Sequence, residues 1–398
     1  MTVVIVGAAM GGLRTAEALR KSGYCEALVM MGDETHLPYN RPPLSKDVLS
    51  TTVSHEAVAF PVRAEVADVT WMLGSAVTSV DLSAHTVTTQ LGVSQGWSAL
   101  VIATGLRPRR LDLPPLAGRH AVRSLDDAIA LRAELRPGAR VVVAGSGFLG
   151  CELAATATKL GCMVTVVTPS EEPMVRPLGR QLAGELRRRL EIEGVEFVTS
   201  TSLDGLVGVD SLTHVIVSGG REIRADVLVE AIGSDCNTEW LAGSGIDLSD
   251  GVLADNALRV ISTEGEVHHD VVVVGDVARF PNPMFDHVPR RIEHWSIPTD
   301  TGKRAGAVLA AHLRNDGSSA DIVATEFAPM PSFWSHQFDV ALQAYGLPGL
   351  ADETRILEGD LQGKVAIGYF RAGVMVGVVG VGLKAALLPY RQQIAAGA

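Results

Sequence analysis

The stretch VVVAGSGFLGCE (141–152) decides the fold class, because it joins a short apolar run to a complete glycine loop. The loop reads G-x-G-x-x-G, with Gly145, Gly147 and Gly150 at the required spacing. In this motif the first glycine makes the tight turn, the second lets the backbone approach a pyrophosphate, and the third permits close helix–strand packing. Free N–H groups and the positive end of the helix would then hold the phosphates. We therefore predict a dinucleotide site here.

A less regular loop opens the chain in MTVVIVGAAMGG (1–12). It keeps Gly7 and Gly12, but Ala9 replaces the middle glycine. Alanine costs little where φ is negative, although its methyl group adds bulk near the phosphates. This stretch taken alone is either a second nucleotide site or a glycine-rich start to an ordinary strand and helix.

Acidic residues after the second strand of each unit bear on the cofactor. Asp33 and Glu34 lie at a distance suited to holding a ribose diol, and the alternative is that both are exposed loop acids. The corresponding strand of the second unit ends at Thr168, without such an acid. No arginine directly follows that strand to favour a 2′-phosphate, although Arg176 is near. We expect NADH to be preferred to NADPH.

Strand-like and helix-like segments alternate through most of the chain, which favours α/β domains with parallel sheets. The two glycine loops begin similar βαβ units about 138 residues apart, with helices expected over about 11–22 and 149–160. Near residues 329–331 the pattern changes to short turn-rich segments, and 363–382 reads as a β-hairpin. We predict two Rossmann-like dinucleotide-binding domains and a small C-terminal α+β domain.

Composition narrows the possible functions. Lys and Arg total 34 against 45 acidic residues, and the net charge of −11 argues against nucleic-acid binding. No apolar run approaches the roughly 20 residues of a membrane span, and no signal peptide is visible, so we expect a cytoplasmic protein. The four cysteines are far apart, which argues against a redox-active disulfide or a zinc site.

The segment HLPYNRPPLSKDVL (36–49) carries two cations on a stiff loop. Pro42 and Pro43 restrict the backbone between Arg41 and Lys46, and so hold the two charges at a fixed separation. Such a pair beside a nucleotide fold suits contacts with a pyrophosphate and an isoalloxazine ring. A solvated basic loop is the alternative.

With these motifs together, the chain resembles the flavoprotein ferredoxin reductases that serve bacterial cytochromes P450 and Rieske-type dioxygenases, of the putidaredoxin reductase kind. The resemblance spans essentially the whole chain. It rests on RPPLSK (41–46), ATG (103–105), GSGFLGCE (145–152), VVVVGDVARF (271–280), RRIEHW (290–295) and PSFWSHQFD (331–339).

The resemblance implies a glutathione reductase-like arrangement with an FAD-binding domain over 1–110 and 231–321, an NAD(P)-binding domain over 111–230, and a C-terminal interface domain over 322–398. The implied FAD contacts are Gly7, Ala9, Met10, Gly12, Asp33, Glu34, Arg41, Lys46, Val77, Ala103, Thr104, Gly105, Arg123, Asp276, Trp295 and Ile297. The implied NAD contacts are Gly145, Gly147, Phe148, Leu149, Gly150, Glu152, Thr168, Ile232 and Gly233.

The resemblance also implies roles within these sets. Lys46 and Glu152 would pair beside the reacting rings and act in catalysis, and Asp276 would bind the ribityl chain, with the following helix directed at the pyrophosphate. We interpret His294 as structural, because hydride transfer to a flavin needs little proton catalysis. The segments Ser296-Ile297-Pro298 and Thr301-Gly302, together with Ser332, His336 and Cys236, depart from the family pattern.

The implied activity is reduction of FAD by NADH, with NADPH as the alternative donor, followed by electron transfer to a small acidic iron–sulfur ferredoxin. Candidate docking cations are Arg290, Arg291, Arg304, Arg314, Lys384 and Arg391. We expect no nucleic-acid or membrane partner, and a monomer or weak dimer. Alternatives on the same scaffold are a rubredoxin reductase or an NAD(P)H oxidase. A nucleotide-dependent interaction protein, like the apoptosis-inducing flavoproteins, is an alternative from another class.

Overall fold

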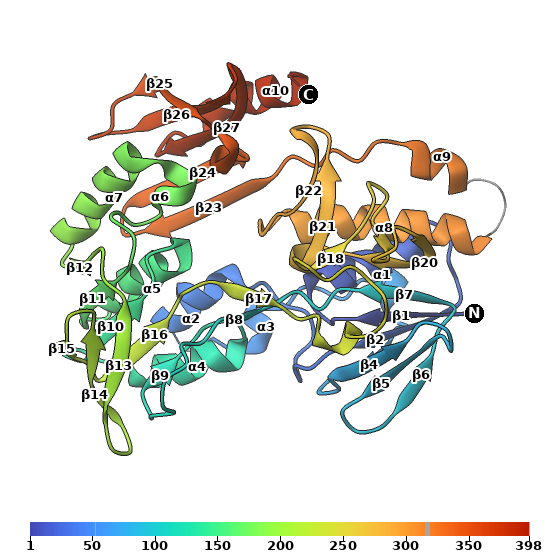
Figure 1. The fold of residues 1–398 in the computed structure, drawn as a ribbon, viewed down its shortest axis with the longest axis horizontal. Helices are drawn as coiled ribbons and strands as arrows, with labels where there is room; N and C mark the ends of the chain where they lie inside the picture. The colour runs from blue at the N-terminus through green and yellow to red at the C-terminus, as the bar shows by residue number, and fades with distance from the viewer. Residues whose placement is uncertain (52, 315–318, 398) are drawn as a thin grey trace.

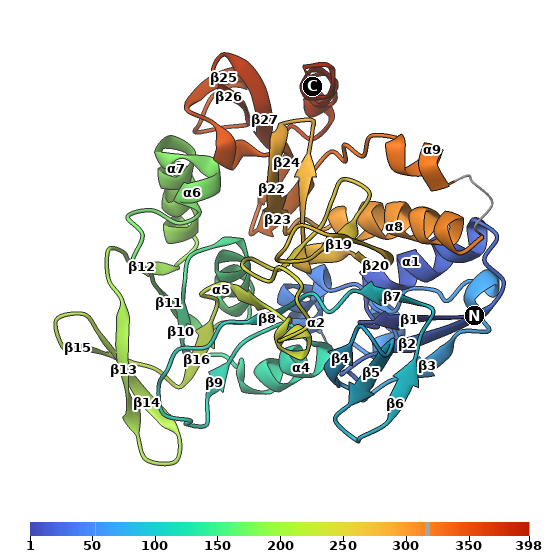
Figure 2. The ribbon, with the colours of Figure 1, turned by 45° about the vertical axis from the view of Figure 1, so that its right-hand side comes forward.

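The computed structural model describes residues 1–51, 53–314 and 319–397. Two layered α/β units lie side by side, and an antiparallel sheet from the end of the chain lies along both of them (Figures 1 and 2). The predicted α/β class is therefore confirmed. Among the helices that the structure describes, none combines the length and apolar character needed to cross a membrane.

The first unit is built on a six-stranded sheet of order β19-β20-β7-β1-β2-β3. Its strands are β1 (Thr2–Val6), β2 (Ala27–Met31), β3 (Thr70–Met72), β7 (Ala99–Ile102), β19 (Arg259–Ile261) and β20 (Val267–Val273). The central strands β1 and β7 pair in parallel and are apolar at almost every position. Strands covered on both faces require such continuous apolar runs.

Two helices cover one face of this sheet, α1 (Met10–Lys21) and α8 (Ile297–Arg314). They approach closely at two glycines of α8. A Cβ atom on Gly302 would lie 3.0 Å from the Gly11 carbonyl oxygen, and one on Gly306 would lie 2.9 Å from that of Thr15. This contact brings the start of α8 against the first glycine loop, although the contacting residues Gly302 and Gly11 lie 291 positions apart in the chain.

The second unit is built on a parallel five-stranded sheet of order β12-β11-β10-β16-β9. Its elements are β9 (Arg119–His120), β10 (Arg140–Ala144), α5 (Phe148–Lys159), β11 (Met163–Val167), α6 (Val175–Leu178), α7 (Arg180–Ile192), β12 (Glu196–Val198) and β16 (Val227–Glu230). Two antiparallel strands, β8 (Leu106–Pro108) and β17 (Ser234–Cys236), join it to the first unit where the chain crosses in each direction.

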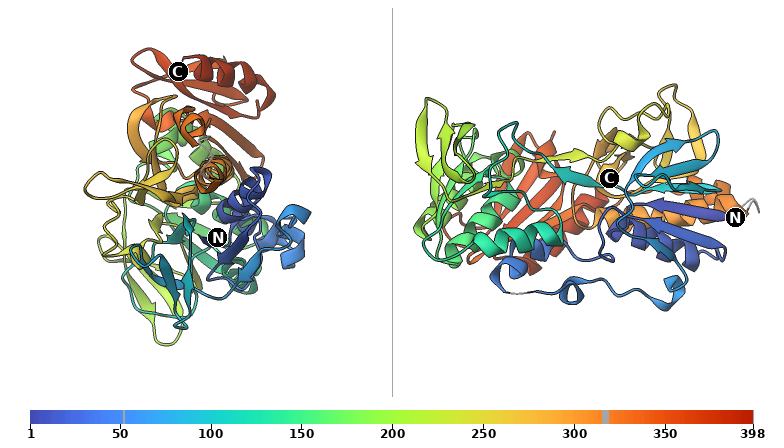
Figure 3. Two further views of the ribbon diagram at one scale, coloured as in Figure 1. Left: turned by 90° about the vertical axis from the view of Figure 1, so that its right-hand side faces the viewer. Right: turned by 90° about the horizontal axis from the view of Figure 1, so that it is seen from below.

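The C-terminal sheet is antiparallel, with order β23-β24-β27-β26-β25. Its elements are β23 (Ser332–Gln337), β24 (Val340–Gly346), β25 (Glu353–Gly359), β26 (Val365–Arg371), β27 (Val374–Val381) and α10 (Leu388–Ala396). The hairpin predicted over 363–382 is β26–β27. Strand β23, at the edge of this sheet, packs against helix α5 of the second unit. Seen from below, the orange-red C-terminal strands lie beside the green second unit (Figure 3).

The remaining elements form smaller sheets and connections. The strands are β4 (Val77–Asp81), β5 (Thr86–Thr89), β6 (Ser94–Gly96), β13 (Leu203–Gly208), β14 (Leu212–Val217), β15 (Arg221–Arg224), β18 (Val252–Leu253), β21 (Ala278–Asn282) and β22 (Asp286–Arg291). The helices are α2 (Asp47–Ser50), α3 (His55–Val58), α4 (Leu125–Glu134) and α9 (Ser319–Ala324). The short 3₁₀ turns are η1 (Pro42–Ser45), η2 (Ala64–Val66), η3 (Glu239–Leu241), η4 (Gly275–Val277), η5 (Pro348–Leu350) and η6 (Ala385–Leu387).

Candidate active site between the two glycine loops

A cleft of about 710 Å³ lies where the two α/β units and strand β23 meet. The start of α1, the turn η1, the start of α5 and the turn η4 all line it. Of the predicted residues, those that line the cleft are Ala9, Met10, Arg41, Lys46, Ala103, Gly105, Arg123, Phe148, Leu149, Glu152, Asp276 and Trp295. Residues predicted for two different nucleotides therefore share one cavity.

The first helix turns of α1 and α5 are open to anions. Neither helix has a side-chain N-cap, and neither carries an acidic residue in its first turn. Their first N–H groups are thus not satisfied by a capping side chain, and the positive ends of both helices are not neutralised. Ala9 and Gly147 occupy the N-cap positions of α1 and α5. This geometry suits one pyrophosphate at each helix start.

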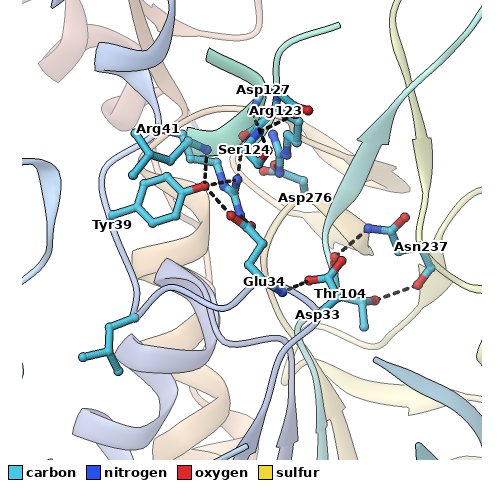
Figure 4. Close-up of polar contacts among 12 residues, drawn as sticks. Asp33, Glu34, Tyr39, Arg41, Thr104, Arg123, Ser124, Asp127, Asn237 and Asp276 are labelled. Atoms are coloured by element: carbon cyan, nitrogen blue, oxygen red, sulfur yellow. Dashed lines mark hydrogen bonds and ion pairs between the residues drawn. The ribbon is translucent and has the colours of Figure 1, made fainter. Parts of the chain in front are cut away.

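An ion-pair group holds the RPPLSK loop beside the first unit (Figure 4). Arg41 donates to Glu34 at 2.6 Å and to the Arg123 carbonyl at 2.6 Å. The Tyr39 hydroxyl donates to the second Glu34 oxygen at 2.5 Å, and burial raises the pKa of Tyr39. Because both Glu34 oxygens are engaged, exposed Asp33 is the acid with more capacity left for a ribose diol. Sequence reasoning missed Tyr39, although it lies within the quoted loop.

Asp276 lies in η4 at the floor of the cleft. Burial raises the pKa of Asp276, although Arg123 Nη2 lies 3.3 Å from its carboxylate. Arg123 Nε is buried and has no partner among the described residues. An additional polar group in the cleft would satisfy this donor, as buried polar groups require.

The helix expected after Asp276 begins later than the sequence suggested. Strands β21 and β22 follow the turn, and α8 starts only at Ile297. Ile297, which was predicted to contact the flavin, is fully buried and does not line the cleft, whereas its neighbour Pro298 does. A Cβ atom added to Gly11 or to Gly275 would lie 3.8 Å from the Pro298 side chain. The start of α8 therefore does face the first loop.

Lys46 and Glu152 meet across the boundary between the two units. Lys46 Nζ lies 2.5 Å from Glu152 Oε2, which also accepts from the Ser45 hydroxyl at 2.7 Å. The Thr156 hydroxyl, one turn further along α5, donates to the Ser45 carbonyl at 2.7 Å. Helix α5 of the second unit thus holds the turn η1 through two buried hydrogen bonds. The ion pair implied by the family resemblance is present in the structure.

Aromatic side chains line the wall of the cleft near this pair. The Phe333 ring lies 4.9 Å from both Phe148 and His294, measured between ring centroids. Trp295 contacts Trp334 edge to face at 5.2 Å and donates to Asn40 Oδ1 at 3.0 Å. Burial lowers the pKa of His294 to about 4, which keeps the imidazole neutral at pH 7. An aromatic, largely uncharged wall of this kind suits contact with planar rings.

Other predicted residues support the cleft from outside its lining. Thr168 is buried, and its hydroxyl accepts from Ser146 at 2.8 Å and from the Ser170 N–H at 3.2 Å. Thr104 and Asn237 exchange hydrogen bonds where the chain re-enters the first unit. The remaining predicted residues outside the lining are Gly7, Gly12, Asp33, Glu34, Val77, Gly145, Gly147, Gly150, Ile232 and Gly233.

The candidate docking cations are mostly engaged within the molecule. Arg290 pairs with Asp286, and Arg291 with Asp250 and Glu293. Arg304 donates to the Thr325 carbonyl at 2.6 Å, and Arg314 donates to that of Ser22. Lys384 and Arg391 are exposed on the C-terminal domain, with Arg391 over the Tyr345 ring. Lys384 and Arg391 are exposed and make no salt bridge with the residues that the structure describes, so they are the stronger candidates for contact with another protein.

The residues present fit FAD and a nicotinamide nucleotide. The open N-terminus of α1, the orphaned Arg123 Nε and the buried Asp276 carboxylate offer donors and an acceptor along one side of the cleft. The open N-terminus of α5 and the space around Gly147, where a Cβ atom would meet nothing within 4 Å, offer the second phosphate site.

Comparison with known proteins defines the class. Residues 1–302 match the family described as pyridine nucleotide-disulphide oxidoreductase, and residues 332–398 match the reductase C-terminal domain. The chain belongs to the pyridine nucleotide-disulphide oxidoreductase family and is an oxidoreductase.

Individual relatives cover nearly the whole chain. The ferredoxin–NAD(+) reductase component of the anthranilate 1,2-dioxygenase system of Burkholderia cepacia is 34% identical over 99% of this chain and 94% of its own. Rhodocoxin reductase of Rhodococcus erythropolis is 32% identical over 96% of this chain and 86% of its own. Putidaredoxin reductase, solved in a covalent complex with putidaredoxin, superposes with a TM-score of 0.89 at 25% identity, over 99% of this chain and 93% of its own.

Proposed function

We propose that this chain transfers electrons from NADH, or less efficiently NADPH, through bound FAD to a small iron–sulfur ferredoxin that feeds an oxygenase. One observation carries the proposal: the open starts of α1 and α5 face one cleft, and Lys46 and Glu152 bridge the two units inside it. When bound, FAD accepts a hydride from the nicotinamide and releases its electrons singly. The names of the relatives support the same activity.

The residues of the chain supply position and electrostatics. Asp276 and Arg123 would hold the ribityl side of the flavin, and Phe148 and Phe333 would hold the planar rings. Lys46, held by Glu152, would place its positive charge beside the reacting rings, where an electron-rich flavin develops negative charge. A charge fixed in advance in a partly buried site stabilises such a product without reorganisation. Closing the nicotinamide against the flavin is a proximity effect.

The proposal includes a division into domains and a partner. Residues 1–110 and 231–321 would bind FAD, 111–230 would bind the nicotinamide nucleotide, and 322–398 would form the interface domain. The β8–β17 ribbon supports the first two boundaries. The last boundary falls within α9, so the end of that helix at Ala324 divides the chain better. A small acidic ferredoxin suits exposed Lys384 and Arg391 and the Trp295 side of the cleft.

The alternatives are distinguishable. None of the described residues lining the cleft is a cysteine, which disfavours an oxidase or disulfide reductase that works through a thiol. Anaerobic titration of the yellow protein with NADH and NADPH, followed by cytochrome c reduction with candidate ferredoxins, tests the proposal. Rapid ferredoxin-dependent turnover supports a reductase. Slow bleaching with a lasting NADH complex would instead indicate a nucleotide-dependent interaction protein.

A further inference from the structure

Strand β23 of the C-terminal sheet reaches into the site between the two glycine loops. Its residues at alternate positions, Phe333, Ser335 and Gln337, face the second unit, as the period of a strand requires. Phe333 packs on Phe148 of the glycine loop, and the Gln337 side-chain amide donates to Met174 Sδ at 3.4 Å. Ser335, between them, is 1% exposed.

The Ser335 hydroxyl contacts the bridging carboxylate directly. It donates to Glu152 Oε1 at 2.8 Å, and the His336 N–H lies 3.4 Å from the same oxygen. The other oxygen, Oε2, accepts from Lys46 and Ser45 of turn η1. The two oxygens of Glu152 are therefore divided, one facing the flavin-side turn and one facing the C-terminal strand.

This division has a physical consequence for Lys46. Glu152 is 7% exposed, and a buried carboxylate is stable only when hydrogen bonds satisfy both oxygens. Without the Ser335 hydroxyl, Oε1 would retain only the long contact from His336. The carboxylate could then turn toward other donors and away from Lys46. Lys46 Nζ would be left with the hydrogen bonds that it already donates to the Pro42 carbonyl and the Ser45 hydroxyl, at 3.2 and 3.1 Å.

We infer that Ser335 is a positioning residue of the hydride-transfer site, contributed by the C-terminal domain, which holds Glu152 so that Lys46 stays directed at the reacting rings. The inference rests on the proposed function. It assigns the C-terminal domain a part in the entry of electrons from the nicotinamide nucleotide, in addition to any contact with the ferredoxin.

The test compares Ser335→Ala with Ser332→Ala in the FAD-loaded protein. Ser332 lies on the same strand, and its hydroxyl makes no hydrogen bond within residues that the structure describes. Anaerobic mixing with saturating NADH should reduce the flavin of Ser335→Ala about tenfold more slowly than that of the wild type, because a hydrogen bond to a charged group is lost. Ser332→Ala should match the wild type. Equal rates for both variants would overturn the inference.

Two further measurements separate positioning from general damage. In a Lys46→Ala background, the added Ser335→Ala should have little effect on flavin reduction, since Ser335 acts only through the pair of Glu152 and Lys46. In the FAD-free protein, competitive acylation read by mass spectrometry should label Lys46 several-fold faster in Ser335→Ala than in the wild type. Additive rate losses or unchanged labelling would contradict the inference. A wild-type protein that NADH fails to reduce would instead refute the proposed function.

Discussion

The two glycine loops, GAAMGG (7–12) and GSGFLG (145–150), agree at their ends and differ in the middle. The first glycines, Gly7 and Gly145, have φ of 119° and 102°. A Cβ atom on them would lie 2.1 Å from the Ala103 carbonyl oxygen and 2.3 Å from that of Ala231. The last glycines, Gly12 and Gly150, would each place a Cβ atom 2.2 Å from the carbonyl oxygen of the first. Close backbone packing therefore requires glycine at these four positions.

The middle position follows another rule. Ala9 has φ of −115° and Gly147 has φ of −71°, both accessible to any L-residue. A Cβ atom on Gly147 would meet nothing within 4 Å. The middle glycine of the motif is thus not required by the fold, and its replacement by Ala9 costs the protein chain little. What the methyl group changes is the room beside the helix start.

The largest expected effects come from Gly7→Ala and Gly145→Ala. Each forces a Cβ atom into a carbonyl oxygen at a φ that alanine rarely adopts, which costs several kcal/mol locally. Gly7→Ala should yield protein without FAD. Gly145→Ala should retain FAD, yet its flavin should not be reduced by NADH while dithionite still bleaches it. Flavin content and anaerobic reduction measure both outcomes. Loss of FAD from both variants alike would refute the assignment of one nucleotide to each loop.

A second prediction concerns the bridge between the two loops. Lys46→Ala leaves the Glu152 carboxylate without its cation in a partly buried site, and should slow flavin reduction by NADH about 100-fold. Stopped-flow absorbance measures the rate. The matched control is Lys21→Ala, an exposed lysine at the opposite end of α1 from the cleft. An unchanged rate in Lys46→Ala would reject its catalytic role.

A third prediction concerns His294, which lines the cleft. Because the pKa of His294 is lowered to about 4, the unfolded chain binds more protons than the folded chain between pH 6.5 and 4. The stability that the neutral imidazole contributes is therefore present at pH 7 and is lost as the pH falls through this window. From pH 7 to pH 5, the free energy of unfolding should fall by about 1 to 2 kcal/mol more in the wild type than in His294→Gln. Urea unfolding at both pH values measures this, and identical pH slopes would exclude a buried neutral His294.

The smallest effects are expected where the loops differ. Ala9→Gly should change FAD affinity by no more than about threefold and should lower stability by about 0.5 to 1 kcal/mol, through the greater freedom of the unfolded chain. Gly147→Ala should raise the KM for NADH a few-fold without loss of stability, because its methyl group enters the open space at the α5 start. Calorimetric FAD titration of the stripped protein and steady-state kinetics measure the two. A large gain in FAD affinity on Ala9→Gly would show that the methyl group obstructs the pyrophosphate.

Local patterns predicted the parts of the site that depend on backbone geometry. The spacing of Gly145, Gly147 and Gly150 and the apolar strand before them predicted the helix start, because each glycine has its own steric reason. The family resemblance, rather than spacing, indicated the pairing of Lys46 with Glu152. Ser335 and Tyr39 were missed, although both lie in quoted motifs. Their roles depend on where distant strands and turns pack, and no local periodicity contains that information.

Two predicted contact residues lie outside the lining of the cleft for the same reason. Thr168 comes directly after β11, at the position where a ribose ligand is expected, but its hydroxyl accepts a hydrogen bond from the Ser146 hydroxyl. Ile297 lies next to a cleft residue, yet the first turn of α8 points it into the core and leaves Pro298 at the surface of the cleft. One residue of helical rotation decides such cases, and neighbouring sequence cannot predict it without the packing partner.

The proposed electron transfer is tested most directly by mixing the anaerobic, FAD-loaded wild-type protein with one equivalent of NADH in the presence of an oxidised ferredoxin from an oxygenase system. We predict rapid bleaching of the flavin, followed by its reoxidation as two equivalents of the one-electron ferredoxin become reduced. A flavin that NADH leaves oxidised, or that stays reduced beside an oxidised ferredoxin, would contradict the account.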